Sequence, residues 1–186
     1  MALTTVLPDT FSRAVSAFKQ VEAREEILLE EVRAPEKLAT YSYALGATVM
    51  RRGEEVATGR LVVLHEPAGH EAWEGTTRLV CYVTAEVEPE MADDPLLSQV
   101  AWGWLIDALD GQTAGYRAIG GTITLTSSTR FGGLSGPSTT DLEIRASWTP
   151  LRGVEKHLEA WCALLASTAG LPPVGVAALP LRRALR

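Results

Sequence analysis

The segment His65–His70 comes closest to a known catalytic spacing. It reads His-Glu-Pro-Ala-Gly-His, whereas a zinc protease helix carries His-Glu-x-x-His. The second histidine stands one residue too late, and the intervening proline and glycine prevent a regular helix. A loop could still gather His65, Glu66, His70 and Glu71 around a metal ion. The alternative is that His65 ends a strand and His70 is exposed in a loop.

Acidic residues concentrate in the segment 86–94, directly before the longest apolar helix pattern. Hard cations such as Ca²⁺ and Mg²⁺ bind carboxylate oxygens, but the spacing of an EF-hand loop is absent here. Acids near the start of a helix are also favoured by the helix dipole alone. Capping and solubility therefore explain this segment without a metal ion, and we expect no resident cofactor.

The segment Phe131–Pro137 is rich in glycine and contains one serine. A hydrolase elbow would need a glycine where Pro137 stands, and a strand-turn-helix context around the serine. A phosphate-binding loop would need Gly-Lys followed by Ser or Thr at the start of a helix. Neither pattern is present, so the segment is interpreted as a hairpin turn.

Five tryptophans give the strongest indication of a binding surface. Trp148 and Trp161 occupy positions that the local periodicities assign to the core. Trp102 and Trp104 are about 200° apart around a helix, so one of them is expected to face away from the sheet. Coverage of this pair by the last helix or by the tail is the alternative to a binding role. Because interface centres are rich in aromatic residues, the candidate binding residues are Trp73, Trp102, Trp104 and Phe131.

A long apolar helix is predicted over Asp94–Gly111. Asp94 is suited to cap its free N–H groups, Pro95 to its first turn, and Gly111 to a left-handed stop. Apolar residues cover nearly its whole circumference, apart from one narrow polar stripe. We therefore expect the helix to lie on a sheet and to be covered also by a second helix, by the tail or by a partner subunit.

Alternating apolar and polar residues predict five strands, joined mainly by short turns. The predicted strands are Tyr41–Met50, Val56–His65, Thr77–Val87, Tyr116–Thr129 and Thr140–Thr149. Further helices are predicted over residues 10–23 and Gly153–Ala169, whereas Ile27–Val32 fits either a helical extension or a short extended segment. The paired glycines at 120 and 121 indicate a bulge. The order α-βββ-α-ββ-α predicts a two-layer α+β fold, with a mainly antiparallel five-stranded sheet covered by helices.

Length and composition fit one domain over residues 1–186, with residues 171–186 as an extended tail. The chain is 46% hydrophobic and carries a net charge of −6, which argues against sequence-independent binding of nucleic acid. The arginines of the tail, Arg182, Arg183 and Arg186, are thin support for a role in RNA binding.

Neither a signal peptide nor an apolar run long enough to span a membrane is found in the sequence. Cys81 and Cys162 stand alone, outside any zinc or redox spacing, and are expected to be small core residues. We therefore expect a cytoplasmic protein in a reducing compartment, without a membrane partner.

Several segments, taken together, resemble the actinobacterial family called domain of unknown function three thousand. They are Gly59–Gly69, Glu71–Thr76, Glu86–Met91, Asp93–Leu97, Phe131–Leu134, Glu143–Thr149 and His157–Cys162. The resemblance extends over roughly Phe11 to Pro173. It implies a single-domain bacterial protein and supplies no catalytic residues. The element order, separately, resembles the secretion-chaperone-like fold, whose members bind polypeptides and commonly dimerise; fold alone does not imply function.

The leading hypothesis is a non-enzymatic protein-binding module, an adaptor or a chaperone-like protein. We expect it to act as a homodimer or together with another polypeptide. The second hypothesis is a metal-dependent hydrolase, with the metal at His65, Glu66, His70 and Glu88. An accessory role in RNA metabolism, through the arginine tail, is the third.

Overall fold

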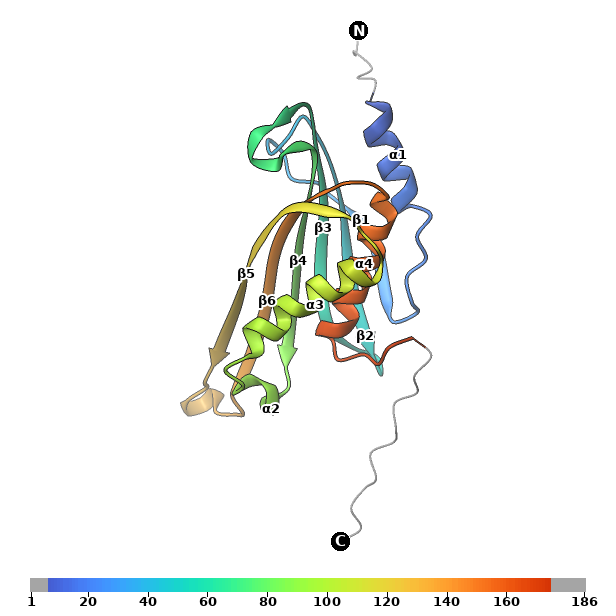
Figure 1. The fold of residues 1–186 in the computed structure, drawn as a ribbon. Coiled ribbons are helices and arrows are strands. Elements are labelled where there is room, and N and C mark those ends of the chain that lie inside the picture. Colours follow the sequence, from blue (N-terminus) through green and yellow to red (C-terminus); the bar gives the residue numbers. More distant parts are fainter. Residues whose placement is uncertain (1–6, 175–186) are drawn as a thin grey trace.

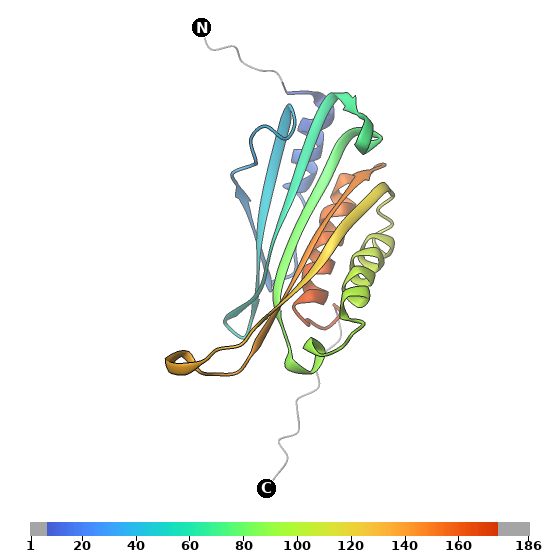
Figure 2. The same cartoon turned by 90° about the vertical axis from the view of Figure 1, so that its left-hand side faces the viewer.

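Six strands form one antiparallel sheet in the computed structural model, and the helices pack against one face of it (Figure 1, Figure 2). The structure describes residues 7–174. Their elements are α1 (Asp9–Phe18), β1 (Ile27–Val32), β2 (Tyr41–Arg51), β3 (Glu54–His70), β4 (Gly75–Val87), α2 (Pro89–Ala92), α3 (Leu97–Gly111), β5 (Tyr116–Ser128), β6 (Thr139–Pro150) and α4 (Val154–Thr168), with short 3₁₀ turns η1 (Glu71–Trp73) and η2 (Gly132–Leu134). Within this part of the chain, every helix is too short or too polar to span a bilayer.

The strand order in the sheet is β1-β2-β3-β4-β6-β5. Strands β1 to β4 follow one another as a meander, but β6 lies between β4 and β5. The chain therefore crosses from β4 through α3 to the far edge of the sheet, and then returns inward as β6 (Figure 1). The α+β class and the antiparallel sheet are confirmed.

The expectation of five strands is wrong, because Ile27–Val32 forms the additional edge strand β1. Ile27 pairs with Val49 and Val32 with Ala44 on β2. The N–H of Met50 also donates to the carbonyl of Glu26, at 2.8 Å. The backbone groups of β2 need hydrogen-bond partners on both sides, and the short segment supplies them on the outer one. Pairing with β2 therefore makes Ile27–Val32 a strand, whereas the sequence pattern fitted either a helix or an extended segment.

Several predicted boundaries also change. The first helix ends at Phe18 instead of residue 23, and β3 continues past His65 to His70. The paired glycines do mark a break in register between β5 and β6, as predicted.

The central helix α3 begins at Leu97, and Pro95 is not in its first turn. The carboxylate of Asp94 accepts a hydrogen bond from the N–H of Leu96, at 2.8 Å, so Asp94 stabilises the turn that precedes the helix. Gly111 is still helical, and the left-handed position falls at Thr113, whose φ is +54°. As expected, α3 is covered by a second helix, since it packs against α4.

Alternate residues of the strands form the core against the helices, as the sequence pattern predicts. The large, fully buried side chains include Trp148, Trp161, Leu61, Leu79, Leu105, Leu142, Ile144, Leu158 and Leu165. On the opposite face a smaller cluster forms around Ala44, Val62 and Leu64, with Trp73 packed against it. Helices thus cover one face of the sheet, and only a small apolar cluster covers part of the other.

The helix α4 lies directly on the sheet because β3 has a glycine beneath it. A Cβ atom at Gly59 would stand 2.9 Å from Cζ2 of Trp161 and 2.9 Å from Cδ2 of Leu165. Such a contact is too short for any side chain larger than hydrogen. Gly59 therefore sets how closely α4 approaches β3. The helix ends before Gly170, whose φ of +64° is the left-handed conformation in which helices often stop.

A buried histidine joins α4 to β6. The Nε1–H of Trp148 donates to Nδ1 of His157, at 2.9 Å. Since Nδ1 accepts, the neutral ring carries its hydrogen on Nε2, and this atom has no partner among the described residues. Burial lowers the pKa of His157 from 6.5 to about 4. The ring is therefore neutral in the folded protein at pH 7.

We predict that His157 makes the free energy of unfolding fall as the pH drops from about 6.5 to about 4. In the unfolded chain His157 is protonated below its ordinary pKa of 6.5, whereas in the folded chain it is protonated only below about pH 4. This difference in pKa corresponds to a loss of about 3 kcal/mol in the free energy of unfolding. Urea unfolding of His157→Phe across this range should lack that part of the slope. His70→Phe, which changes an exposed histidine, should keep it. Equal slopes in both variants would contradict the assignment.

Candidate functional site

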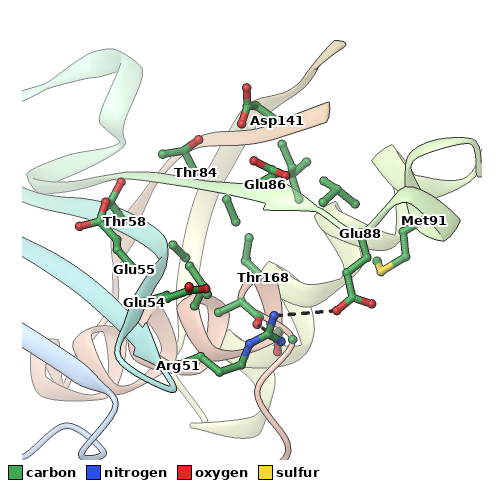
Figure 3. Close-up of a pocket in the computed structure, with 18 of the residues that line it drawn as sticks. Arg51, Glu54, Glu55, Thr58, Thr84, Glu86, Glu88, Met91, Asp141 and Thr168 are labelled. Carbon is green, nitrogen blue, oxygen red and sulfur yellow. Dashed lines mark hydrogen bonds and ion pairs between the residues drawn. The ribbon is translucent and has the colours of Figure 1, made fainter. Parts of the chain in front are cut away.

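A cleft of about 600 Å³ lies at the base of the sheet, where the strands continue past the ends of α3 and α4 (Figure 3). We call it the base cleft. Its floor is apolar, because Ala57, Ala85, Val87 and Leu142 occupy positions of the helix-facing side of the sheet. An apolar floor with a few polar groups around it is typical of a site that binds a ligand.

The walls of the base cleft come from three helices. Trp104 of α3 and Met91 of α2 line one part of it, and Thr168 and Ala169 at the end of α4 line another. Figure 3 shows the Met91 side chain pointing into the cleft. Trp104 is half-buried, so part of its indole contacts the core and part is left for a ligand.

The mouth of the base cleft is charged. Nη2 of Arg51 lies 3.9 Å from Oε1 of Glu88, and Nη1 of the same arginine donates to the carbonyl of Ala169, at 3.4 Å (Figure 3). Glu54 is a further carboxylate at the mouth. The carboxyl end of α4 adds the negative end of its helix dipole. Two carboxylates and a helix end thus face one guanidinium, which favours a positively charged group on an incoming ligand.

Two further acids that line the base cleft, Glu86 and Asp141, occupy strand positions of the opposite face of the sheet. Glu86 pairs with Asp141 across β4 and β6, and successive strand residues alternate between faces. Figure 3 shows both carboxylates on the far side of the strands from Arg51.

The surface of α3 next to the base cleft carries exposed apolar residues. Leu96 is 57% exposed and Val100 is 43% exposed. With Trp104 they are spaced by four residues, so they form one row along the helix, which we call the α3 strip. The core-facing row is a different one, made by Leu97, Ala101, Leu105 and Leu109. The α3 strip therefore extends the apolar surface of the cleft onto the outside of the molecule.

The other candidate binding residues are spread over the molecule. Trp102 is half-buried on the opposite flank of the core-facing row from Trp104, and both pack partly against the core. Trp73 lies between β3 and β4, and Phe131, which is 78% exposed, lies between β5 and β6 at the other end of the sheet (Figure 1). Only Trp104 contributes to the base cleft.

The residues of the metal hypothesis do not meet. His65 is 4% exposed, its Nδ1 lies 3.0 Å from Oγ1 of Thr77, and its ring stacks on Phe11. Burial lowers the pKa of His65. Glu66 accepts hydrogen bonds from Thr40, which lower the pKa of its carboxyl. His70 instead stacks on Trp73, with ring centroids 4.7 Å apart.

Glu88 stands at the opposite end of the sheet from these histidines. His65 pairs with Thr77, and Glu88 follows eleven residues later along β4. The separation is roughly 35 Å, at about 3.3 Å per strand residue. Among residues 7–174 there is no group of three or more His, Cys, Asp or Glu side chains placed to hold a metal ion.

The cysteines are buried, as expected. Burial raises the pKa of both the Cys81 and Cys162 thiols to about 12. Both thiols therefore stay protonated near neutral pH and are poor nucleophiles. The arginines Arg182, Arg183 and Arg186 lie outside the described residues.

Most residues of the base cleft, Arg51 and Met91 among them, were not among the sequence candidates. Arg51 is the last residue of β2, directly before a hairpin turn, where a surface arginine gives no signal. Met91 belongs to the short helix α2, which the sequence pattern did not predict. The α3 strip does have a signal in the sequence, namely the four-residue spacing of Leu96, Val100 and Trp104.

Comparison with known proteins gives one match. The model of a family described as protein of unknown function (DUF3000) matches residues 7–177, which include every residue that lines the base cleft and stop short of the three arginines. No curated protein and no solved structure matches the chain.

We predict that the charged groups at the mouth contribute little to the stability of the fold. The Arg51 and Glu88 side chains are 40% and 67% exposed, and an exposed ion pair contributes about 0.5 kcal/mol. Arg51→Gln and Glu88→Gln should therefore each change the free energy of unfolding by less than about 1 kcal/mol, measured by urea unfolding. Trp148→Ala, in the core, should lose about 3 to 5 kcal/mol. A large loss from Glu88→Gln would contradict this view of the mouth.

Proposed function

The chain belongs to the family described as protein of unknown function DUF3000, and we propose that it is a polypeptide-binding adaptor. The observation that carries the proposal is the base cleft, an apolar hollow with a charged mouth and an exposed apolar row beside it. The cleft takes one or two apolar side chains of a partner segment. Its mouth takes an arginine or lysine next to them.

The base cleft offers little chemistry beyond binding. The polar side chains of its lining belong to Arg51, Glu54, Glu55, Thr58, Thr84, Glu86, Glu88, Asp141, Ser167 and Thr168. The Arg51 guanidinium is held between Glu88 and the carbonyl of Ala169. The carboxylates of Glu54 and Glu88 are suited to bind a cationic group of a ligand. An ion pair between a carboxylate and a guanidinium combines charge attraction with directional hydrogen bonds.

The kind of segment that fits the cleft can be inferred from its apolar floor and its charged mouth. An apolar floor leads to an acidic mouth, so a fitting segment carries an apolar residue followed by a basic one. Extended segments with apolar anchors are commonly recognised in this way.

This proposal agrees with the protein-binding, chaperone-like hypothesis drawn from the sequence. Apart from the added β1 and the short α2, the element order is the one that the secretion-chaperone-like expectation rests on. The homodimer and the cytoplasmic location remain part of the proposal. Two buried, unpaired thiols support a reducing compartment, and the exposed α3 strip supports contact with a second copy.

We predict that peptides selected from a displayed random library on the immobilised full-length chain will combine an apolar residue with an adjacent arginine or lysine. Glu88→Lys should weaken their binding by at least about tenfold, since it replaces attraction at the mouth by repulsion. Glu90→Lys is the matched control, because Glu90 is exposed on α2 and does not line the cleft. It should change binding less than about threefold.

The proposal fails if no peptide is enriched, or if the enriched peptides bind Glu88→Lys as well as the unaltered chain. Peptides that lose affinity equally in both lysine variants would indicate a response to overall charge, and would also overturn the cleft as their site.

We predict a homodimer by native mass spectrometry, with the α3 strip in its interface. Val100→Glu should convert the dimer to monomer, because it places a charge among apolar contacts. Gln99→Glu adds the same charge to the neighbouring exposed residue, outside the α3 strip, and should leave the dimer intact. A monomeric unaltered protein would exclude the dimer, and a dimeric Val100→Glu would place the interface elsewhere.

A further inference from the structure

We propose that residues 175–186 of the chain itself occupy the base cleft in the free protein and compete there with a partner segment. This inference rests on the proposed function of the cleft as a polypeptide site, and it names a second ligand for it. The tail lies outside the described residues, so the case is made from the cleft, from the point where the tail departs and from its sequence.

The departure point of the tail is fixed beside the cleft. Helix α4 ends at Thr168, and the next two residues, Ala169 and Gly170, still line the cleft. The position of a Cβ atom on Gly170 is 3.5 Å from Nη1 of Arg51, the arginine of the mouth. The chain is therefore at the mouth when it leaves the helix.

A second contact holds the chain after it leaves α4. Nη1 of Arg24 donates to the carbonyl of Pro172, at 3.0 Å. The same guanidinium makes a paired contact with the carboxylate of Glu26, at 2.7 and 2.9 Å. This holds Pro172 close to the start of β1, at the same end of the sheet as the cleft.

The tail is long enough for its arginines to reach the mouth of the base cleft. Arg182 is the ninth residue after Pro173, and a chain of that length can span up to roughly 30 Å. The cleft begins within a few residues of the departure point, so Arg182 and Arg183 can reach the mouth after a reversal of the chain. A tethered segment has an effective concentration in the millimolar range, so weak contacts suffice to hold it.

The sequence of the tail fits the cleft in order and in charge. Leu179-Pro180-Leu181 is followed directly by Arg182-Arg183, and Leu185 by Arg186. This repeats the combination of apolar and basic residues that the floor and the mouth favour. In a chain with a net charge of −6, these three arginines put positive charge on the segment that is tethered to an acidic mouth.

Glu88 has capacity for a second guanidinium. Its 3.9 Å separation from Arg51 is an ion pair but is too long for a hydrogen bond. Two-thirds of the Glu88 side chain is exposed, so an arginine can approach without displacing Arg51. Glu54 offers a further carboxylate at the same mouth. The tail therefore adds contacts that the described residues leave unfilled.

The test uses the methyl groups of methionine as reporters in the full-length chain. The sequence contains three methionines. Met91 lines the base cleft, whereas Met50, on β2, does not. We expect the Met91 methyl resonance in carbon-13-labelled protein to move when Arg182, Arg183 and Arg186 are all changed to Ser. The Met50 resonance should stay in place.

A peptide with the sequence of residues 174–186, added to the triple-serine protein, should return the Met91 resonance toward its original position in a saturable manner. Glu88→Lys in the otherwise unaltered chain should reproduce the effect of the triple substitution on Met91. Glu90→Lys should not, because Glu90 is outside the cleft.

The outcomes separate this proposal from the proposed function. If Met91 has the same resonance in the unaltered and triple-serine proteins, the tail does not occupy the cleft, although library-selected peptides can still bind there. If the tail does occupy it, those peptides should bind the triple-serine protein at least about tenfold more tightly than the unaltered chain. Equal affinity for both proteins overturns the competition, and failure of the peptides to bind either protein overturns the function of the cleft.

Discussion

The unequal rise of strands and helices is the constraint on which the shape of this molecule depends. The 17 residues of β3 extend over roughly 56 Å at 3.3 Å per residue, whereas the 15 residues of α4 extend over roughly 22 Å at 1.5 Å per residue. A single helix therefore cannot cover the sheet from end to end. The helix α1 covers the top, where Phe11 meets His65, and α4 covers the middle through Gly59 (Figure 2). The base of the sheet is left without a helix above it, and the base cleft forms there.

Much of this fold follows from local patterns in the sequence. Strict alternation in β2, β4 and β6 assigns each side chain to one face, and these strands pair as expected because burial fixes their register. The segment Ile27–Val32 has no such alternation, since its apolar residues are adjacent. Its secondary structure is set by pairing with the free edge of β2, so it cannot be predicted from the segment's own sequence.

The site is less predictable than the fold, because its residues meet only through the connections between strands. Trp104 was a candidate from its residue type, and Glu88 was a candidate for a metal site that its distance from His65 does not support. Arg51 reaches Glu88 because a hairpin turn ends β2 at the same end of the sheet at which β4 finishes. No local sequence pattern predicts that Arg51 and Glu88 lie close together. The helix capping signal at Asp94 misled for a similar reason, since the preceding residues form α2 and the carboxylate serves a turn between two helices.

The late position of β6 governs the order in which the sheet can be assembled. Strands β1 to β4 pair with their sequence neighbours, so this half needs only short loops to close. The inner edge of β4 has no partner until residues 139–150 are available, because β6 inserts between β4 and β5. During synthesis on the ribosome, a strand edge with apolar residues on one face therefore waits for more than fifty residues before it is paired, from Val87 to Thr139. Unpaired edges of this kind are where nascent chains associate with one another, so the crossover through α3 defines the interval in which this protein is most exposed to misassembly.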